Sequence, residues 1–143
     1  SNSGYPLDLN LYQSIKGISA AAQIARDGGT IICTAECIDG LPEHGEYKRI
    51  LTERNNLKDL LEMIKTPGHN RHDQWQVQIQ AQIQQRARVF LKSTYLDPDQ
   101  VRAAHLEPVG DLQTLIWETI ERHGRDAKVC ALPQGPQTIP YVK

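Results

Sequence analysis

The sequence has no long apolar run, few cysteines and almost no net charge. Its 143 residues include three cysteines, 16 basic and 17 acidic side chains, and the formal net charge is −1. No stretch approaches the ~20 apolar residues that a membrane-spanning helix needs. We expect no secretory leader, because the first residues lack a basic start followed by an apolar core. The balanced charge gives no electrostatic reason to expect binding to nucleic acid or to an anionic membrane.

The three cysteines are Cys33, Cys37 and Cys130. An odd number argues against a disulfide framework. Cys33 and Cys130 lie in apolar, strand-like runs, where a buried thiol behaves as a small hydrophobic side chain. We therefore predict packing roles rather than redox or metal-binding roles for these thiols, and a reducing, cytoplasmic location for the protein.

The length of the chain suits one compact domain that can bury a core without disulfides or a metal. We interpret residues 1–3 as a linker or a remnant of an expression vector, and we leave them out of the predicted fold. Residues 4–143 are then expected to form a single domain.

Helical and strand-like segments alternate along the chain. A helix that begins after Asn10 has apolar residues at spacings of three and four, and it is expected to end near Arg26. A buried strand is predicted at 30–35, after the Gly28-Gly29 turn. The remaining predicted elements are helices at 46–54, 57–65, 73–86, 97–105 and 111–123, strands at 88–93 and 129–132, a short extended piece at 106–109, and an irregular tail at 134–143.

Residues 74–85 are ambiguous, because apolar residues alternate with glutamines as they do in a strand. A single strand from 75 to 93 would far exceed the usual length of ~5–6 residues. Trp75, Ile79 and Ile83 also fit one face of a helix, and glutamine is a good helix former. The sequence therefore favours a helix followed by a strand.

The alternation of helices and strands predicts an α/β fold. We expect a three-layer α/β/α sandwich with a mostly parallel central sheet of about four strands, joined by right-handed crossovers. The 36–45 loop follows the first strand at its carboxyl end, where α/β domains usually place ligand contacts.

Tyr12, Gln13 and Lys16 form the most informative cluster of side chains. Lys16 is three residues from Gln13 and four from Tyr12, so both pairs share a helix face. The free N–H groups and the dipole of the first helical turns favour an anion, and an ammonium with an amide can hold a carboxylate there. The alternative is a solvated lysine beside a packed tyrosine, and the residues alone leave both interpretations open.

Longer motifs around this cluster resemble a known family. Gly4-Tyr5-Pro6-Leu7-Asp8, followed by Tyr12-Gln13-Ser14-Ile15-Lys16, is similar to the entrance of the C-terminal domain of the nickel-dependent lactate racemase family. The likeness continues at 28–32, at 35–40, and at Gln74-Trp75-Gln76 ahead of Arg88-Val89-Phe90-Leu91. It touches most of the chain, and its most specific part lies in residues 4–40.

The resemblance implies the C-terminal, substrate-closing domain of a larger 2-hydroxy acid racemase or epimerase. In this family an N-terminal domain holds a nickel-pincer nucleotide that accepts hydride from C2 of the substrate, and two histidines act as acid and base. The closing domain supplies glutamine and lysine to the substrate carboxylate. This implies substrate-binding roles for Gln13 and Lys16, with Tyr12 beside them and Trp75 approaching from the 67–76 loop. No catalytic residue, metal or cofactor is expected in this chain, and the isolated domain is expected to be inactive.

The five histidines are not assigned to the family's catalytic or metal-binding roles. His69 and His72 are three residues apart, but they lie in a loop broken by proline and glycine, without a further thiolate or carboxylate pattern. We expect both to be surface residues. His123, beside Gly124, is expected at the carboxyl end of a helix, where it meets the helix dipole.

Two other functions are compatible with parts of the sequence. One is a non-catalytic α/β binding or assembly module that shares the fold. The other, a nucleotide-binding domain, is weaker because the chain has neither G-x-G-x-x-G nor a P-loop. A closing domain should expose Tyr12, Gln13 and Lys16 together on a concave face, whereas a structural module should pair or splay away Lys16 and place Tyr12 in the core.

Overall fold

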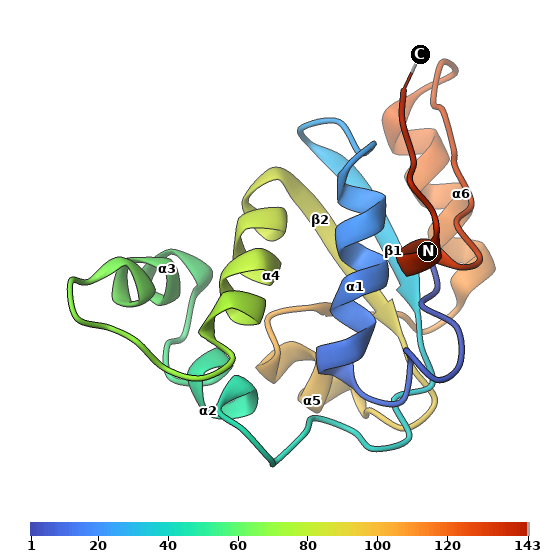
Figure 1. Cartoon of the computed structure of the whole chain (residues 1–143). Coiled ribbons are helices and arrows are strands. Elements are labelled where there is room, and N and C mark those ends of the chain that lie inside the picture. Colours follow the sequence, from blue (N-terminus) through green and yellow to red (C-terminus); the bar gives the residue numbers. More distant parts are fainter. Residues whose placement is uncertain (143) are drawn as a thin grey trace.

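A computed structural model describes residues 1–142 and shows helices that alternate with parallel strands (Figure 1). The predicted α/β class with a parallel sheet is confirmed. In chain order the elements are α1 (Leu11–Ala22), β1 (Gly29–Thr34), α2 (Tyr47–Leu51), α3 (Leu57–Lys65), α4 (Gln74–Arg86), β2 (Ala87–Lys92), α5 (Pro98–Ala103), β3 (Glu107–Pro108), α6 (Leu112–His123) and the 3₁₀ turn η1 (Gly135–Gln137).

The sheet has the strand order β1-β2-β3, and both pairs of neighbours are parallel. β1 and β2 pair along their whole length, from Gly29 opposite Ala87 to Thr34 opposite Lys92. Three strands in the described chain are one fewer than the prediction of about four. The strand expected at 129–132 is not formed, because no described strand lies beside it, and Val129 is 71% exposed.

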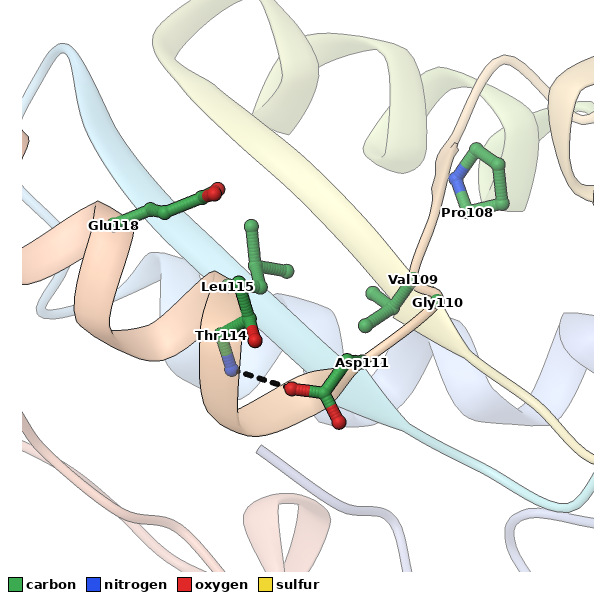
Figure 2. Close-up of a pocket in the computed structure, with 7 residues that line it drawn as sticks. All are labelled: Pro108, Val109, Gly110, Asp111, Thr114, Leu115 and Glu118. Carbon is green, nitrogen blue, oxygen red and sulfur yellow. Dashed lines mark hydrogen bonds between the residues drawn. The ribbon is translucent and has the colours of Figure 1, made fainter.

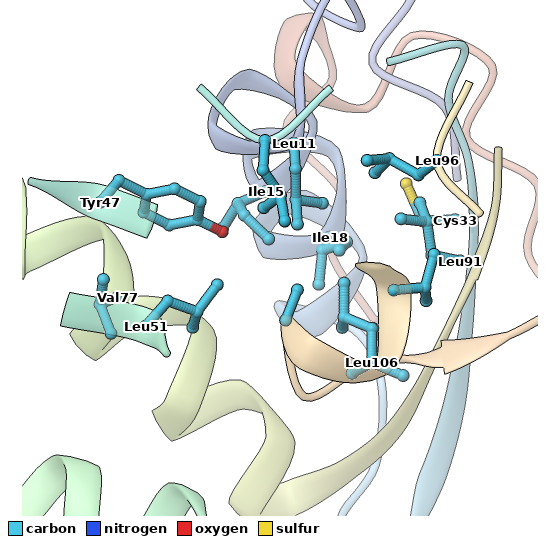
Figure 3. Packing of buried hydrophobic residues seen from close by; sticks show 14 of the residues in the cluster. Leu11, Ile15, Ile18, Cys33, Tyr47, Leu51, Val77, Leu91, Leu96 and Leu106 are labelled. Atoms are coloured by element: carbon cyan, nitrogen blue, oxygen red, sulfur yellow. The ribbon is translucent and has the colours of Figure 1, made fainter. Parts of the chain in front are cut away.

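One face of the sheet packs against α1 and α4 and contains most of the hydrophobic core (Figure 3). Odd-numbered positions of β1 point into this core, while even-numbered positions face the other side. The apolar spacing of three and four in α1 places one stripe of the helix against the sheet. The fully enclosed residues of these elements include Leu11, Ile15, Ile18, Ile31, Cys33, Val77, Val89 and Leu91.

α4 is the helix that the length argument predicted, but its buried face differs from the expected one. Trp75 is exposed and Ile79 and Ile83 are only partly buried, whereas Gln76 and Gln80 are enclosed. The glutamines are buried because their amides bond polar groups that would otherwise lack partners. Gln76 Nε2 donates to the carbonyl oxygen of Tyr12 (2.8 Å), and Gln80 Nε2 donates to that of Ala104 (2.7 Å).

Two predicted helices are shorter in the structure. α1 ends at Ala22 rather than near Arg26, because the N–H groups of Gln23 and Ile24 bond carbonyl groups only three residues back and tighten the last turn. The helix expected at 46–54 is reduced to the five residues of α2. The ends of the other helices and strands lie within about two residues of their predicted positions, a normal uncertainty for such boundaries.

The opposite face of the sheet is covered by α6, none of whose residues is buried. Asp111 caps α6 as the sequence predicts, and its carboxylate accepts the N–H of Thr114 (2.7 Å). His123 is the last residue of the helix, and its ring bonds Thr30 Oγ1 on β1 (3.1 Å) and the guanidinium of Arg26 (3.0 Å). The third layer of the sandwich is therefore present but thinly packed.

Residues 1–3, which the sequence analysis left out of the fold, are part of it. Asn2 pairs with Thr34 in a parallel bridge. Ser3 Oγ accepts the N–H of Gly17 (3.1 Å), and Ser3 is buried. A side chain at Gly17 would come within 2.7 Å of that oxygen, so glycine lets α1 pack directly on this segment.

The cysteines divide into two kinds. Cys33 and Cys37 are buried and Cys130 is exposed, which corrects the prediction for Cys130. The thiol of Cys130 is exposed because the 129–132 segment lacks the neighbouring strand that would cover it. Burial raises the pKa of Cys33 to about 12. Within residues 1–142 no helix is long and apolar enough to cross a membrane.

Candidate functional site

The candidate site lies at the amino end of α1. The loop that follows β1 contacts the segment that leads into α1: Asp39 N–H donates to the carbonyl of Leu9 (2.7 Å), and Leu11 N–H donates to that of Gly40 (3.1 Å). The side chain of Asn10 caps the helix by accepting the N–H of Gln13 (3.0 Å). The first turn of α1 therefore sits at the carboxyl edge of the sheet, the usual place for a ligand site in an open α/β domain.

Gln13 and Lys16 lie side by side on α1, as their spacing predicts. The ammonium of Lys16 donates to Oε1 of Gln13 at 2.6 Å. Among the described residues, no carboxylate lies within 4.0 Å of Lys16, although both side chains are partly buried. Because Oε1 of Gln13 accepts from the ammonium, the Gln13 amide nitrogen remains as a donor. The pair offers positive charge and N–H donors, which complement an anionic oxygen ligand.

Tyr12 and Trp75 form an aromatic wall beside this pair. The Tyr12 ring makes edge-to-face contacts with the rings of Tyr47, at 5.4 Å between centroids, and of Trp75, at 5.9 Å. The bond from Gln76 to the Tyr12 carbonyl ties the first turn of α4 to the first turn of α1. Trp75 is half exposed and belongs to α4, so it does not approach from the 67–76 loop as the sequence analysis expected.

Asp73 supports this wall from the residue before α4. It has a left-handed backbone, with φ of 67°, and its carboxylate accepts the N–H of Glu46 (3.0 Å). Burial, followed by the charge of Asp73, raises the pKa of the Tyr12 phenol. A side chain at Gly45 would approach to 2.2 Å from the Asp73 carboxylate, so glycine makes room for it.

Sequence reasoning missed Asp73 and its close contact with Gly45. The two residues are 28 positions apart, and no motif joins them. A non-glycine residue with positive φ is uncommon, and this conformation cannot be read from local pattern. Only the folded structure shows that Asp73 joins the loop before α2 to the start of α4 and to Tyr12.

The structure brings the four predicted residues together as two contacting pairs. Gln13 bonds Lys16, and Tyr12 packs on Trp75. The two pairs are connected because Tyr12, Gln13 and Lys16 all lie on the first two turns of α1. The arrangement can hold a small anion against a partly apolar wall, whereas the side chains at this edge form no nucleophile–base pair.

Two surface depressions among the described residues lie elsewhere. One, of about 230 Å³, lies between β3 and α6, where Figure 2 shows the Asp111 cap and its apolar neighbours. The other, of about 420 Å³, lies between α1 and α4 and includes Ser19 and Arg86. Neither contains Tyr12, Gln13 or Lys16, so neither supplies the concave face that was expected around these residues.

The described residues form no cluster of the side chains that usually bind a metal. No group of three or more His, Cys, Asp and Glu side chains able to hold a metal occurs in residues 1–142. His72 is exposed, as expected, but His69 is half-buried and bonds Gln74 (2.8 Å), because the loop folds back on the start of α4. His105 bonds the carbonyl of Leu51 (2.9 Å). His69 and His105 therefore bond separate local partners.

The fold and this edge define a parallel α/β domain with a cationic and aromatic surface at the start of its first helix. The chain belongs to the lactate racemase C-terminal domain family, whose family model matches residues 1–139. It is 36% identical to a lactate racemase of Lactiplantibacillus plantarum over 94% of this chain and 32% of that protein. It is 34% identical to a lactate racemase of Thermoanaerobacterium thermosaccharolyticum over 97% of this chain and 33% of that protein.

A solved structure agrees with these sequence matches. The lactate racemase apoprotein from Thermoanaerobacterium thermosaccharolyticum superposes with a TM-score of 0.81 and 31% identity, over 94% of this chain and 33% of that chain. The chain thus spans about a third of the length of the relatives that it matches.

Proposed function

We propose that this domain closes over the active site of a 2-hydroxy acid racemase or epimerase and binds the substrate carboxylate. The observation that supports this most strongly is the pair of Lys16 and Gln13 at the start of α1. A partly buried ammonium whose only described partner is a neutral amide is electrostatically incomplete, and an anion would complete it.

Each residue at this edge has a distinct proposed role. Lys16 supplies the charge that neutralises the carboxylate. The Gln13 amide donates to a carboxylate oxygen or to the 2-hydroxyl group. Tyr12 and Trp75 form an apolar wall that excludes water when the domain closes, and lower hydration strengthens the charge interactions. The helix dipole of α1 favours the same anion.

The alternative, a non-catalytic module that shares the fold, is less well supported. Such a module should pair or splay away Lys16 and place Tyr12 in the core. Lys16 is paired with Gln13, but this partner is a neutral amide that does not neutralise its charge. Tyr12 lies at the margin of the core, partly buried against the half-exposed Trp75.

The hydride and proton chemistry is assigned to the part of the enzyme outside this chain. The family resemblance implies a nickel-pincer nucleotide in an N-terminal domain of the same polypeptide, and the described residues here do not fit a metal. The buried thiols are consistent with a cytoplasmic enzyme. The proposed division leaves this domain to bind and orient the substrate and to exclude water.

The proposal is tested in the full-length, cofactor-loaded enzyme by measuring C2 epimerisation of lactate and other 2-hydroxy acids. Gln13→Ala and Lys16→Ala should each lower kcat/KM by about 30- to 1,000-fold, equivalent to ~2–4 kcal/mol of lost transition-state stabilisation. Gln113→Ala on α6 and Lys65→Ala on α3 are matched controls at exposed positions, and they should leave kcat/KM unchanged. Unchanged kcat/KM in both site variants would remove the carboxylate-binding role.

The isolated 143-residue chain provides a second test. It should not racemise either enantiomer of lactate, because it lacks residues suited to the hydride and proton steps. Turnover by the purified chain, after removal of contaminating enzyme activity, would contradict the proposed division of labour between two domains.

A further inference from the structure

Two segments of backbone face each other across Ser1 and Asn2. One is the outer edge of β1, the edge that does not pair with β2. The other is the 129–132 segment, which has the composition of a strand but is not one. Residues 128–131 make no backbone–backbone hydrogen bond within the described chain. The edge of a sheet presents unpaired N–H and C=O groups that can pair with a further strand.

Ser1 and Asn2 already bridge the two segments. On one side, the amino group of Ser1 donates to the carbonyl of Ile32 (2.7 Å), and Thr34 N–H donates to the carbonyl of Ser1 (2.9 Å). On the other side, Asn2 N–H donates to the carbonyl of Leu132 (3.0 Å), and Gly135 N–H donates to that of Asn2 (2.8 Å). Neighbouring residues that bond in opposite directions are the pattern of a strand between two others.

The direction of this pairing is also defined. Ser1 donates to Ile32 and accepts from Thr34, two residues further along β1, which is the pattern of parallel strands. Asn2 donates to Leu132 and accepts from Gly135, so the second side runs in the same direction, although the spacing of three residues rather than two shows that the regular pattern ends at Leu132. These two residues therefore have the hydrogen bonds expected at the carboxyl end of a central parallel strand.

We propose that the polypeptide directly before Ser1 in the full-length protein is a parallel strand inserted between β1 and 129–132. The completed sheet would have the order 129–132, inserted strand, β1, β2, β3. Covalent continuity with Ser1 identifies the occupant, and the relatives, about three times as long as this chain, have polypeptide available to supply it. This proposal does not depend on the proposed carboxylate-binding role.

Strand geometry fixes the register of the inserted strand. The residue immediately before Ser1 donates its N–H to the carbonyl of Cys130 and accepts the N–H of Leu132. The second residue before Ser1 donates to the carbonyl of Thr30 and accepts the N–H of Ile32. Because the strand is covered on both faces, it should be an apolar, β-branched run of about five or six residues.

The inserted strand explains how α1 is held in place. Strand, α1 and β1 form one βαβ unit, the basic repeat of a parallel sheet. The turn from Gly4 to Asn10 then leaves the carboxyl end of a central strand and leads directly into the candidate site. Ser1 Oγ donates to the carbonyl of Gly17 (2.9 Å), which ties the end of that strand to the middle of α1.

The inference is tested by hydrogen exchange in the full-length protein, resolved to single amides. The N–H groups of Ile32 and Leu132 should exchange as slowly as that of Val89 in the β2 ladder, on the order of 100-fold or more slower than those of the exposed tail at 139–142. Exchange of Ile32 and Leu132 at the rate of that tail would overturn the proposal.

Proline substitutions test the register. Proline at the second residue before Ser1 should speed exchange at Ile32 and lower the Tm, because it removes the N–H that bonds Thr30. Proline at Arg125, in the turn that precedes the proposed pairing, is the control. If the variant does not fold, wild-type exchange still decides the question. Protection of Ile32 that rises with protein concentration would instead indicate a second copy at this edge and would also overturn the proposal.

Discussion

The two faces of the sheet are built very differently. The face that packs against α1 and α4 holds a continuous core, and several of its side chains are completely enclosed (Figure 3). The face under α6 holds no buried residue of that helix, and Trp117 is 60% exposed. The candidate site belongs to the well-packed face, because Tyr12, Gln13 and Lys16 lie on the helix that this core fixes in place.

This difference shows where the stability of the isolated chain arises. Apolar surface that is removed from water contributes about 25 cal/mol per Å², so the α1 face supplies most of the hydrophobic stabilisation. The described hydrogen bonds that join α6 to other elements are those of His123 with Thr30 on β1 and with Arg26 after α1. The chain should therefore tolerate changes in α6 far better than changes in α1.

The largest expected effect compares equivalent truncations on the two helices. Ile18→Ala on α1 should lower the free energy of unfolding by about 2–5 kcal/mol, because it leaves a cavity in an enclosed core. Leu115→Ala on α6 should lower it by about 1 kcal/mol or less, because that side chain is only half-buried. Urea unfolding of both variants measures the difference. Equal losses would show that α6 is as important to the core as α1.

A smaller effect is expected from the buried amide of Gln80. It accepts the hydroxyl of Tyr47 (2.6 Å) and donates to the carbonyl of Ala104 (2.7 Å). Gln80→Met keeps the volume but leaves both groups without partners, which should cost about 1–3 kcal/mol in the free energy of unfolding.

Adding Tyr47→Phe to Gln80→Met is the matched control. The double variant should recover part of the loss, because the unpaired hydroxyl is gone. A double variant that loses the sum of both single changes would contradict the hydrogen-bond explanation. Unfolding curves of the two single variants and the double variant complete this cycle.

The glutamines of α4 show what the sequence could predict and what it could not. Length and helix propensity identified the helix correctly although its residues alternate with period two. The buried face could not be predicted, because Gln76 and Gln80 are buried for the sake of distant partners. Those partners, the carbonyls of Tyr12 and Ala104, reach the helix only through the tertiary fold.

The contacts of the candidate site also divide into those that the sequence predicted and those that it did not. The contact between Gln13 and Lys16 follows from a spacing of three on one helix, so the sequence alone predicted it. The contact of Tyr12 with Trp75 joins two helices and was not predicted, although the family resemblance implied that Trp75 approaches the site. Asp73 and Gly45 escaped both arguments, because their close approach depends on a left-handed residue and a turn far apart in the sequence.

The strand expected at 129–132 failed for a physical reason of a different kind. Its composition is that of a buried strand, but a strand forms only beside a hydrogen-bonding partner. Within residues 1–142 only Asn2 reaches it, through Leu132 and Gly135. The composition of residues 129–132 correctly indicated a preference for an extended strand. The strand that would pair with these residues is not among the described strands.

The last comparison takes one cysteine from each region. Cys33 is enclosed on the α1 face and Cys130 is exposed beyond α6, so a thiol reagent should modify Cys130 quickly in the native protein and Cys33 only on unfolding.

The burial of Cys33 also makes the stability of the protein depend on pH in the alkaline range. The folded Cys33 thiol keeps its proton up to a pKa of about 12, whereas the unfolded thiol loses it near 9.0.

Between those two pH values the unfolded state binds fewer protons than the folded state, so stability falls as pH rises. The slope attributable to Cys33 should be about 1.4 kcal/mol per pH unit. Burial also raises the pKa of Tyr47, so the wild-type slope contains more than one group. Urea unfolding of Cys33→Ala and Cys130→Ala between pH 8 and 11 separates them: Cys33→Ala should flatten the slope and Cys130→Ala should leave it unchanged. Equal slopes in the two variants would show that the enclosed thiol does not set the alkaline limit, and that the two faces differ less in solvent access than the structure indicates.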